Sequence, residues 1–363
     1  MSSAPNGLSP HPIVQAPMAG GASCPPLAAA VSEAGGLGFL AGGYKTADGM
    51  YQEIKQLRAL TRRPFGVNLF MPQSGSVDQA AVETYRGQLA GEAGWYGISL
   101  AADDTLGTCD DGYEAKLALL IEDPVPVVSF TFGHPAPEAL ARLRRAGTWT
   151  VVTVTSVEEA RAAREAGADA LCVQGSEAGG HQGTHRDDPQ TDGTAAVGLL
   201  SLVTQVREAV PLPIIAAGGV MRGSQIAALL AAGADAAQLG TAFLTCPESG
   251  ADPLHKAALT DPLFVRTELT RAFSGRPARG LVNRFMREHG PYAPAAYPQV
   301  HHLTSGLRKA AAAAGDPQGM ALWAGQGHRL ARTLPAGKLV EVLAAELAET
   351  RGAPENNQMR STS

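Results

Sequence analysis

The residue in this chain best suited to proton transfer is a histidine inside a glycine-rich loop. His181 stands in the stretch QGSEAGGHQG, residues 174–183, which follows a short apolar run. Imidazole gains or loses a proton near neutral pH and serves as a general acid or base. Glycines beside it let a ligand approach the backbone closely. The pattern predicts a catalytic role for His181, and the alternative is an ordinary loop histidine.

Two glycine-containing turns could hold a phosphate. Gly218 and Gly219 follow one apolar run, and Gly240 and Thr241 follow the next. Backbone N–H groups at such turns can reach an anion without obstruction by a Cβ atom, and a threonine hydroxyl adds a donor. One such turn alone indicates only tight packing. The two turns together predict a phosphate site.

Two side-chain amides also end apolar runs. Asn68 and Gln174 each offer a hydrogen-bond donor and an acceptor, which suits the mixed edge of a planar heterocycle. Either amide alone is more simply structural. Both amides beside a phosphate site predict a flavin ring.

The elements that must position these residues are eight short apolar runs that alternate with alanine-rich helical stretches. Each parallel strand needs a crossover, usually a helix, and eight such units predict an α/β fold, a closed (β/α)₈ TIM barrel. The active sites of such barrels lie at the carboxyl ends of the strands, where the residues above stand. The expected strands are Ile13–Met18, Leu37–Ala41, Phe65–Phe70, Val125–Thr131, Trp149–Thr155, Ala170–Gln174, Pro213–Ala217 and Ala236–Leu239.

Two segments interrupt this alternation. Residues 92–123 predict a longer, irregular connection. Residues 244–321 contain several prolines, no clear strand and short helical stretches such as Leu307–Ala314, which predicts a helical substrate domain inserted over the barrel mouth. Leu330–Glu349 is amphipathic and predicts a helix that packs back on the barrel. The expected division is a barrel of residues 1–243 plus 322–350, a substrate domain of 244–321 and a disordered tail of 351–363.

Composition excludes several classes of protein. The 363 residues include 42 glycines but no Gly-X-Y repeat, and 45% are apolar, so collagen and disorder are excluded. A net charge of −5 does not favour nucleic-acid binding, and no apolar run is long enough to span a membrane. The N-terminus lacks the pattern of a signal peptide, so we expect a cytoplasmic protein.

No motif in the chain predicts a metal or a dinucleotide. Cys24, Cys109, Cys172 and Cys246 are far apart, which argues against zinc and against a disulfide framework. The stretch that starts at Asp188 resembles the start of a calcium loop but lacks the closing glutamate. Residues 36–41 match a loose dinucleotide pattern in the wrong place, after a helix and before a strand. We therefore expect no metal.

These segments together resemble the nitronate monooxygenase family, formerly grouped as 2-nitropropane dioxygenase-like flavoproteins. The resemblance runs from about Pro12 to Gly327. It rests on APMAGG at Ala16, PFGVNLF at Pro64, EAGGH within the His181 loop and QLGT at Gln238, with further phrases such as SGRPARGLVN and WAGQG.

The resemblance implies an FMN-dependent barrel that oxidises alkyl nitronates, and neutral nitroalkanes in some cases, with O₂ to a carbonyl compound and nitrite. His181 matches the catalytic histidine of the family and would orient the nitronate or remove the α-proton of a nitroalkane. No nicotinamide is implied, and we expect a monomer or a homodimer. The implied FMN-binding residues are Met18, Asn68, Gln174, Gly179, Gly218, Gly219, Gln238, Leu239, Gly240 and Thr241.

The chain departs from some family members at positions that bear on the substrate. Some members carry His where this chain has Thr131, and a Tyr, Tyr, Lys set where it has Tyr297, His301 and Ser305. A lysine would attract an anionic nitronate, and Ser305 cannot. Alternatives therefore stay open: an FMN-dependent NAD(P)H enoyl-thioester reductase, an NAD(P)H:quinone reductase, or a flavin-binding protein without catalysis.

Overall fold

A computed structural model of the chain describes residues 7–73, 77–100, 110–187 and 197–352. Cys109, most of the calcium-like stretch and the tail beyond Gly352 lie outside these ranges. Within them, no helix combines the length and apolarity that a membrane span requires.

Eight parallel strands form one sheet, which confirms the predicted barrel. Their order around the sheet is β1-β9-β8-β6-β5-β4-β3-β2. The ring closes between its first and last strands, where Gln15 N donates to Leu37 O and Leu37 N donates to Ile13 O, both at 2.9 Å. The strands are β1 (Ile13–Gln15), β2 (Gly38–Ala41), β3 (Phe65–Phe70), β4 (Val127–Thr131), β5 (Trp149–Val154), β6 (Ala170–Gln174), β8 (Ile214–Ala217) and β9 (Ala236–Leu239).

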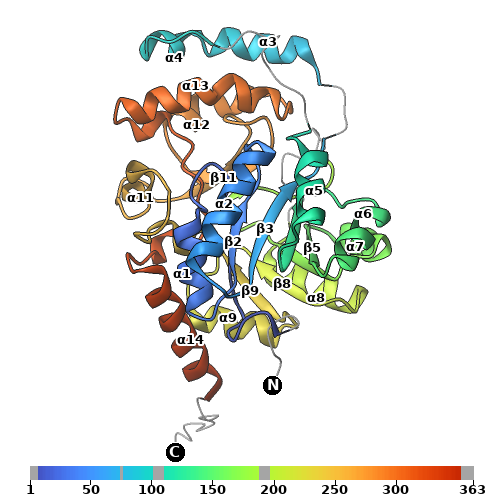
Figure 1. Ribbon diagram of the computed structural model, residues 1–363. Helices are drawn as coiled ribbons and strands as arrows, with labels where there is room; N and C mark the ends of the chain where they lie inside the picture. The colour runs from blue at the N-terminus through green and yellow to red at the C-terminus, as the bar shows by residue number, and fades with distance from the viewer. Residues whose placement is uncertain (1–6, 74–76, 101–109, 188–196, 353–363) are drawn as a thin grey trace, which may run out of the picture.

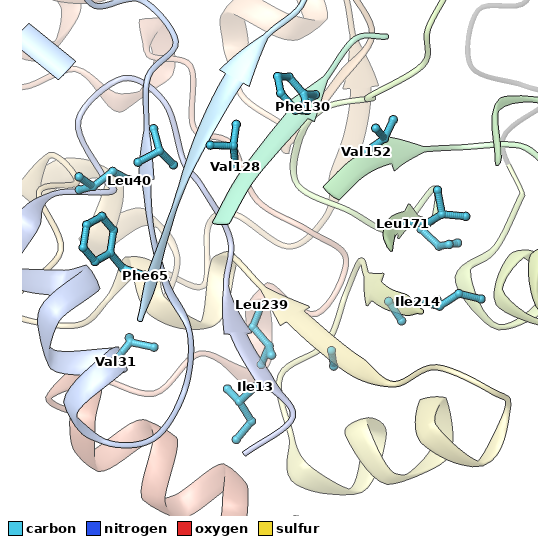
Figure 2. Packing of buried hydrophobic residues seen from close by; sticks show 14 of the residues in the cluster. Ile13, Val31, Leu40, Phe65, Val128, Phe130, Val152, Leu171, Ile214 and Leu239 are labelled. Carbon is cyan, nitrogen blue, oxygen red and sulfur yellow. The ribbon is translucent and has the colours of Figure 1, made fainter. Parts of the chain in front are cut away.

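Helices cover the outside of the barrel and bury its main apolar core. Leu171 and Leu239 from the strands and Val31 from a helix are almost fully excluded from water in this layer (Figure 2). The covering helices are α1 (Pro25–Glu33), α2 (Ala47–Leu60), α5 (Tyr113–Glu122), α6 (Pro137–Arg145), α7 (Val157–Ala166), α8 (Leu199–Ala209), α9 (Gly223–Ala231) and α14 (Ala336–Gly352).

The prediction of an irregular connection over residues 92–123 was wrong in part, because α5 lies there. Tyr113, Leu117 and Leu120 are buried at helical spacing, and the helix fills the crossover between β3 and β4. Gly112, in the left-handed conformation, precedes the helix and offers no capping side chain. The sequence therefore lacks the usual signal for the start of a helix.

The prediction that residues 244–321 contain no strand was also wrong. β10 (Thr267–Thr270) and β11 (Ala278–Leu281) pair antiparallel, and β11 pairs with β7 (Gly180–His181), a two-residue strand in the predicted loop. These strands have four residues or fewer, too short for a visible alternation of apolar and polar side chains. α10 (Thr241–Leu244) leads into this segment, whose α-helices are α11 (Pro253–Ala258), α12 (Arg284–His289) and α13 (Gln299–Ala313). The predicted stretch Leu307–Ala314 overlaps the second half of α13.

Part of the sequence that we assigned to the barrel packs on the insertion instead. α3 (Gln79–Gln88) and α4 (Ala90–Trp95) lie over α13 and α12 (Figure 1), and their apolar residues form a second core with those of the insertion. Tyr85 donates its hydroxyl to Ala272 O at 2.8 Å within this core. Two separate chain segments therefore build the cap over the barrel, and our two-domain division stays a prediction.

The closing helix is shifted from its predicted position. α14 packs against α9 and α1, and it begins at Ala336 and ends at Gly352, so that Arg351 and Gly352 belong to the helix and not to the predicted tail. A short 3₁₀ turn at His328–Leu330 precedes it.

We expect Gly38→Ala to destabilise the barrel by about 3 kcal/mol, because a rigid backbone neighbour leaves no room for a methyl group. A Cβ atom at this position of β2 would lie 2.1 Å from Ala28 O of α1. The matched control is Gly87→Ala in α3, where nothing lies within 4 Å and alanine should stabilise the helix by up to about 1 kcal/mol. Denaturant unfolding of both variants measures the difference, and equal stabilities would contradict this packing.

Candidate active site

A cavity of about 360 Å³ opens at the carboxyl ends of the barrel strands. The segments after β1, β3, β4, β6, β8 and β9 contribute to its wall, together with α13 and residues 320–327 of the cap. Every residue that the sequence predicted for the site lines it: Met18, Asn68, Gln174, Gly179, His181, Gly218, Gly219, Gln238, Leu239, Gly240 and Thr241.

The imidazole of His181 lies in an aromatic shell. Its ring centroid is 5.5 Å from that of Trp323, 5.7 Å from that of Tyr297 and 5.9 Å from that of Phe132. Its Nε2 lies 2.9 Å from Ser274 Oγ. These contacts hold the ring in one orientation at the edge of the cavity.

Ser274 also determines which ring nitrogen carries the proton. In the arrangement in which the Ser274 hydroxyl donates its only hydrogen to Arg276 O at 3.1 Å, its oxygen accepts from His181 Nε2. Nε2 of His181 therefore carries the hydrogen, and Nδ1 is the nitrogen with a free lone pair. This tautomer makes Nδ1 the atom that can accept a proton from a ligand.

The surroundings of His181 keep it neutral. Burial lowers the pKa of its imidazole to about 3, and the positive charges of Arg276 and Arg308 act in the same direction. A neutral imidazole at physiological pH can accept a proton but cannot donate a charge-assisted bond. The side chain is therefore in the form that can accept a proton, and a negative charge beside it would raise the pKa that burial and the two arginines lower.

The loop that carries His181 is fixed by both halves of the molecule. Backbone pairing joins β7 to β11, and Gln182 N donates to Pro277 O at 2.8 Å. On the barrel side, Gln174 donates Nε2 to His181 O at 3.1 Å and accepts from Gly183 N at 2.7 Å. The Gln174 amide thus positions this loop as well as lining the cavity.

The other amides at the strand ends keep an oxygen available. Asn68 donates Nδ2 to Ser129 Oγ and to Thr131 Oγ1, each at 3.0 Å, which leaves Oδ1 as an acceptor at the cavity wall. Gln238 Nε2 lies 3.4 Å from the Cys172 sulfur. Two such oxygens can accept from the N–H edge of a heterocycle.

Another part of the cavity wall offers free backbone donors. Gly218 and Gly219 have φ values of +138° and +68°, which only glycine adopts easily. Within the described residues, the N–H groups of Gly219, Val220 and Gly240 have no hydrogen-bond acceptor. Cavity-lining N–H groups without acceptors fit an anion, and a phosphate satisfies several of them at once.

Met18 contributes shape rather than a free backbone group. Its N–H donates to Ser23 Oγ at 2.8 Å, and its carbonyl accepts from Ser23 N at 3.1 Å. Its sulfur lies 3.7 Å from the position of a Cβ atom at residue 240. Ser23 therefore fixes the loop after β1 against the glycine turn after β9.

Several residues of the site were missed by the sequence reasoning. Arg276 is fully buried, with its guanidinium 4.2 Å from the centroid of the Phe132 ring and a 2.6 Å bond to Gln73 Oε1. Ser274 stands two residues before it, within the phrase SGRPARG that contributes to the family resemblance. A clue to Arg308 was its spacing of seven residues from His301, which places both on one face of a helix.

The positions that depart from the family pattern have distinct surroundings. Thr131 lines the cavity and accepts from Asn68. The His301 ring lines the cavity and stacks on Tyr44, with the centroids 4.2 Å apart. Ser305 donates to His302 O at 2.9 Å inside its own helix and is not among the residues that line the cavity.

The chain thus has the architecture of the (β/α)₈-barrel enzymes, whose active sites lie in a cavity at the carboxyl ends of the strands. The sequence profile of the nitronate monooxygenase family matches residues 3–346. The chain belongs to this family, is an oxidoreductase, and by its family is flavin-dependent.

Known proteins resemble the chain over nearly its whole length. The nitronate monooxygenase of Pseudomonas aeruginosa is 42% identical over 351 residues, which cover 93% of this chain and 96% of the relative. The crystal structure of nitroalkane oxidase from Streptomyces ansochromogenes superposes with a TM-score of 0.93 at 73% identity, covering 96% and 99% of the two chains. FabK from Thermotoga maritima is more distant, with a TM-score of 0.71 and 30% identity over 94% of each chain.

We expect the stability of the protein to fall in acid partly because His301 is buried without charge. Burial and the nearby Arg308 lower the pKa of His301 to about 2, against about 6.5 in an unfolded chain. Below about pH 6.5 the imidazole binds a proton in the unfolded state but stays neutral in the folded state. The free energy of unfolding therefore decreases as the pH is lowered. His301→Gln should remove about 2 kcal/mol of this loss between pH 7 and pH 5. Denaturant unfolding at the two pH values measures it, and equal pH dependences in wild type and variant would refute the assignment.

Proposed function

We propose that the cavity binds FMN non-covalently and that the enzyme oxidises alkyl nitronates with O₂ to a carbonyl compound and nitrite. The observation that carries the proposal is the placement of a neutral histidine with a free Nδ1 in the cavity whose wall also offers unsatisfied backbone N–H groups. The first feature suits a carbon acid or its anion, and the second suits a cofactor phosphate.

The residues present fit FMN at both ends of the cofactor. The turns at Gly218–Gly219 and Gly240–Thr241 would hold its phosphate through backbone donors. Asn68 and Gln238 would face the polar edge of the ring, with Met18, Gln174, Gly179 and Leu239 as neighbours. When bound, FMN supplies the electron-accepting chemistry that amino-acid side chains lack.

His181 acts on the substrate in this proposal. With a neutral nitroalkane, Nδ1 accepts the α-proton and the charged imidazole then lies beside the nitronate that forms. With a nitronate already ionised, the same side chain orients the anion. The rings of Phe132, Tyr297 and Trp323 exclude water around it, which strengthens each electrostatic contact.

A second candidate function is a reductase that uses NAD(P)H with an enoyl thioester or a quinone. The similarity to FabK, at 30% identity, supports this second candidate.

We also propose a cytoplasmic location, in keeping with the three free thiols Cys24, Cys172 and Cys246 of the described residues. For the oligomeric state we propose a monomer or a homodimer.

Anaerobic mixing separates the two candidate functions. We expect the purified protein to be yellow with releasable FMN, and ethyl nitronate to bleach its flavin absorbance rapidly while NADPH does not. Oxygen should restore the absorbance and release nitrite. Rapid bleaching by NADPH with none by the nitronate would establish the reductase instead, and absence of flavin after reconstitution would refute the cofactor.

We expect His181→Asn to lower kcat/KM for neutral nitroethane by about 10²-fold or more, because general-base catalysis is lost. The loss for preformed ethyl nitronate should be smaller, since no proton has to be removed. Ser274→Ala should cost about fivefold, the worth of one hydrogen bond, by freeing the imidazole to change tautomer. Flavin absorbance is the control for intact cofactor binding, and unchanged turnover of both substrates by His181→Asn would refute its role.

A further inference from the structure

Arg308 brings an unneutralised positive charge to the cavity. It lies on α13, seven residues after His301, so that both side chains share the helix face over the barrel, and both line the cavity. Its charge contributes to the low pKa values of His181 and of His301. The guanidinium therefore acts at the same end of the cavity as the catalytic candidate.

No carboxylate neutralises this guanidinium. By contrast, the buried Arg271 pairs with Asp187 at 2.6 Å, and the half-buried Arg284 pairs with Glu92. Within the described ranges the buried Arg276 has no carboxylate partner, but it donates to Gln73 Oε1 and to backbone carbonyls. Among the described residues, Arg308 has no salt bridge, and its buried Nε has no hydrogen-bond acceptor. Burial lowers the pKa of Arg308 below its ordinary value, which indicates an unfavourable site for a cation that lacks an anion.

The contacts of Arg308 leave hydrogen-bond donors of its guanidinium without an acceptor among the described residues. Its Nη2 donates to His301 O at 2.9 Å and lies 3.4 Å from His301 Nδ1. A guanidinium beside Nδ1 makes that nitrogen the acceptor, so Nε2 of His301 carries the hydrogen. The stacked ring of Tyr44 holds this imidazole in place. Arg308 and His301 together form a pair of hydrogen-bond donors at the cavity wall.

We propose that Arg308, assisted by His301, is the residue that recognises the substrate anion in this enzyme. A planar guanidinium binds a planar two-oxygen anion through two parallel hydrogen bonds. Both a nitronate group and a carboxylate farther along the substrate have this chemistry. The cation that Ser305 cannot supply thus comes from the next turn of the same helix. The inference rests on the proposed function, because it assumes an anionic substrate.

Steady-state kinetics of Arg308→Gln tests this role. We expect KM for ethyl nitronate and for propionate 3-nitronate to rise about tenfold or more, with kcat changed less than about threefold and KM for neutral nitroethane unchanged. A rise for both nitronates assigns the guanidinium to the nitronate group. A rise for propionate 3-nitronate alone assigns it to the remote carboxylate. Equal KM values in wild type and variant for both nitronates would overturn the proposal.

Two control variants distinguish loss of the charge at position 308 from a general loss of charge or of folded structure. Lys309→Gln removes the same charge from the adjacent, exposed position of α13 and should leave every KM at the wild-type value. Arg308→Lys keeps the charge without the planar fork and should give intermediate values. Near-ultraviolet circular dichroism and flavin absorbance verify that each variant is folded and loaded.

A binding measurement distinguishes failure of this inference from failure of the proposed function. Nitrate is a stable planar oxyanion, and calorimetric titration of the flavin-loaded protein with nitrate needs no turnover. We expect the wild-type enzyme to bind nitrate at least about tenfold more tightly than Arg308→Gln does. If nitronates are not oxidised but this difference holds, the function is wrong and the anion site stands. If nitrate does not bind, or binds both proteins equally, the anion site is refuted.

Discussion

The site depends on the backbone pairing of β7 with β11. This antiparallel contact joins the loop after the sixth barrel strand to a hairpin of the insertion, and it places His181 opposite Ala278. The hydrogen bond from His181 to Ser274 follows from this register, because Ser274 lies just before β11. A slip by one residue would turn the imidazole to the other face of the small sheet, since side chains alternate along a strand. The chemistry therefore requires the insertion as much as the barrel.

Electrostatics in the cavity follow from this enclosure. Aromatic rings and the cap exclude water from His181 and His301, and the same burial that keeps both imidazoles neutral makes the charges of Arg276 and Arg308 costly. Arg276 is offset by hydrogen bonds to Gln73 and to backbone carbonyls of the His181 loop. Arg308 lacks such a set. Binding of an anion would therefore stabilise the positive charges in this cavity, and we expect the largest stabilisation near Arg308.

Much of the barrel could be predicted because its signals are local. Apolar runs and helical stretches alternate along the chain, and polar residues at strand ends must converge in a closed barrel, so Asn68, Gln174 and the glycine turns were found from spacing alone. The missed features depend on distant partners. β11 is a strand only because Gly180 and His181 complete its ladder, and Ser274 matters only because His181 lies beside it. Likewise, α3 and α4 follow the third strand in sequence, yet their apolar faces are buried against the insertion.

The part of the cavity proposed for FMN and the part proposed for the substrate are built from different kinds of groups. This difference explains why the family could be recognised more easily than the substrate. At the end that we propose for FMN, backbone N–H groups and glycines of the barrel form the wall, so few side chains are needed there and the sequence motif is short and easily recognised. The substrate end is made by side chains of α13 and by the cap, where Arg308 can supply the charge that a neighbouring position supplies in other members. A helix tolerates such a move because positions 301, 305 and 308 lie on one face. Specificity can thus shift along α13 while the strand ends stay unchanged, and the substrate must be inferred from where the charge lies in the folded cavity.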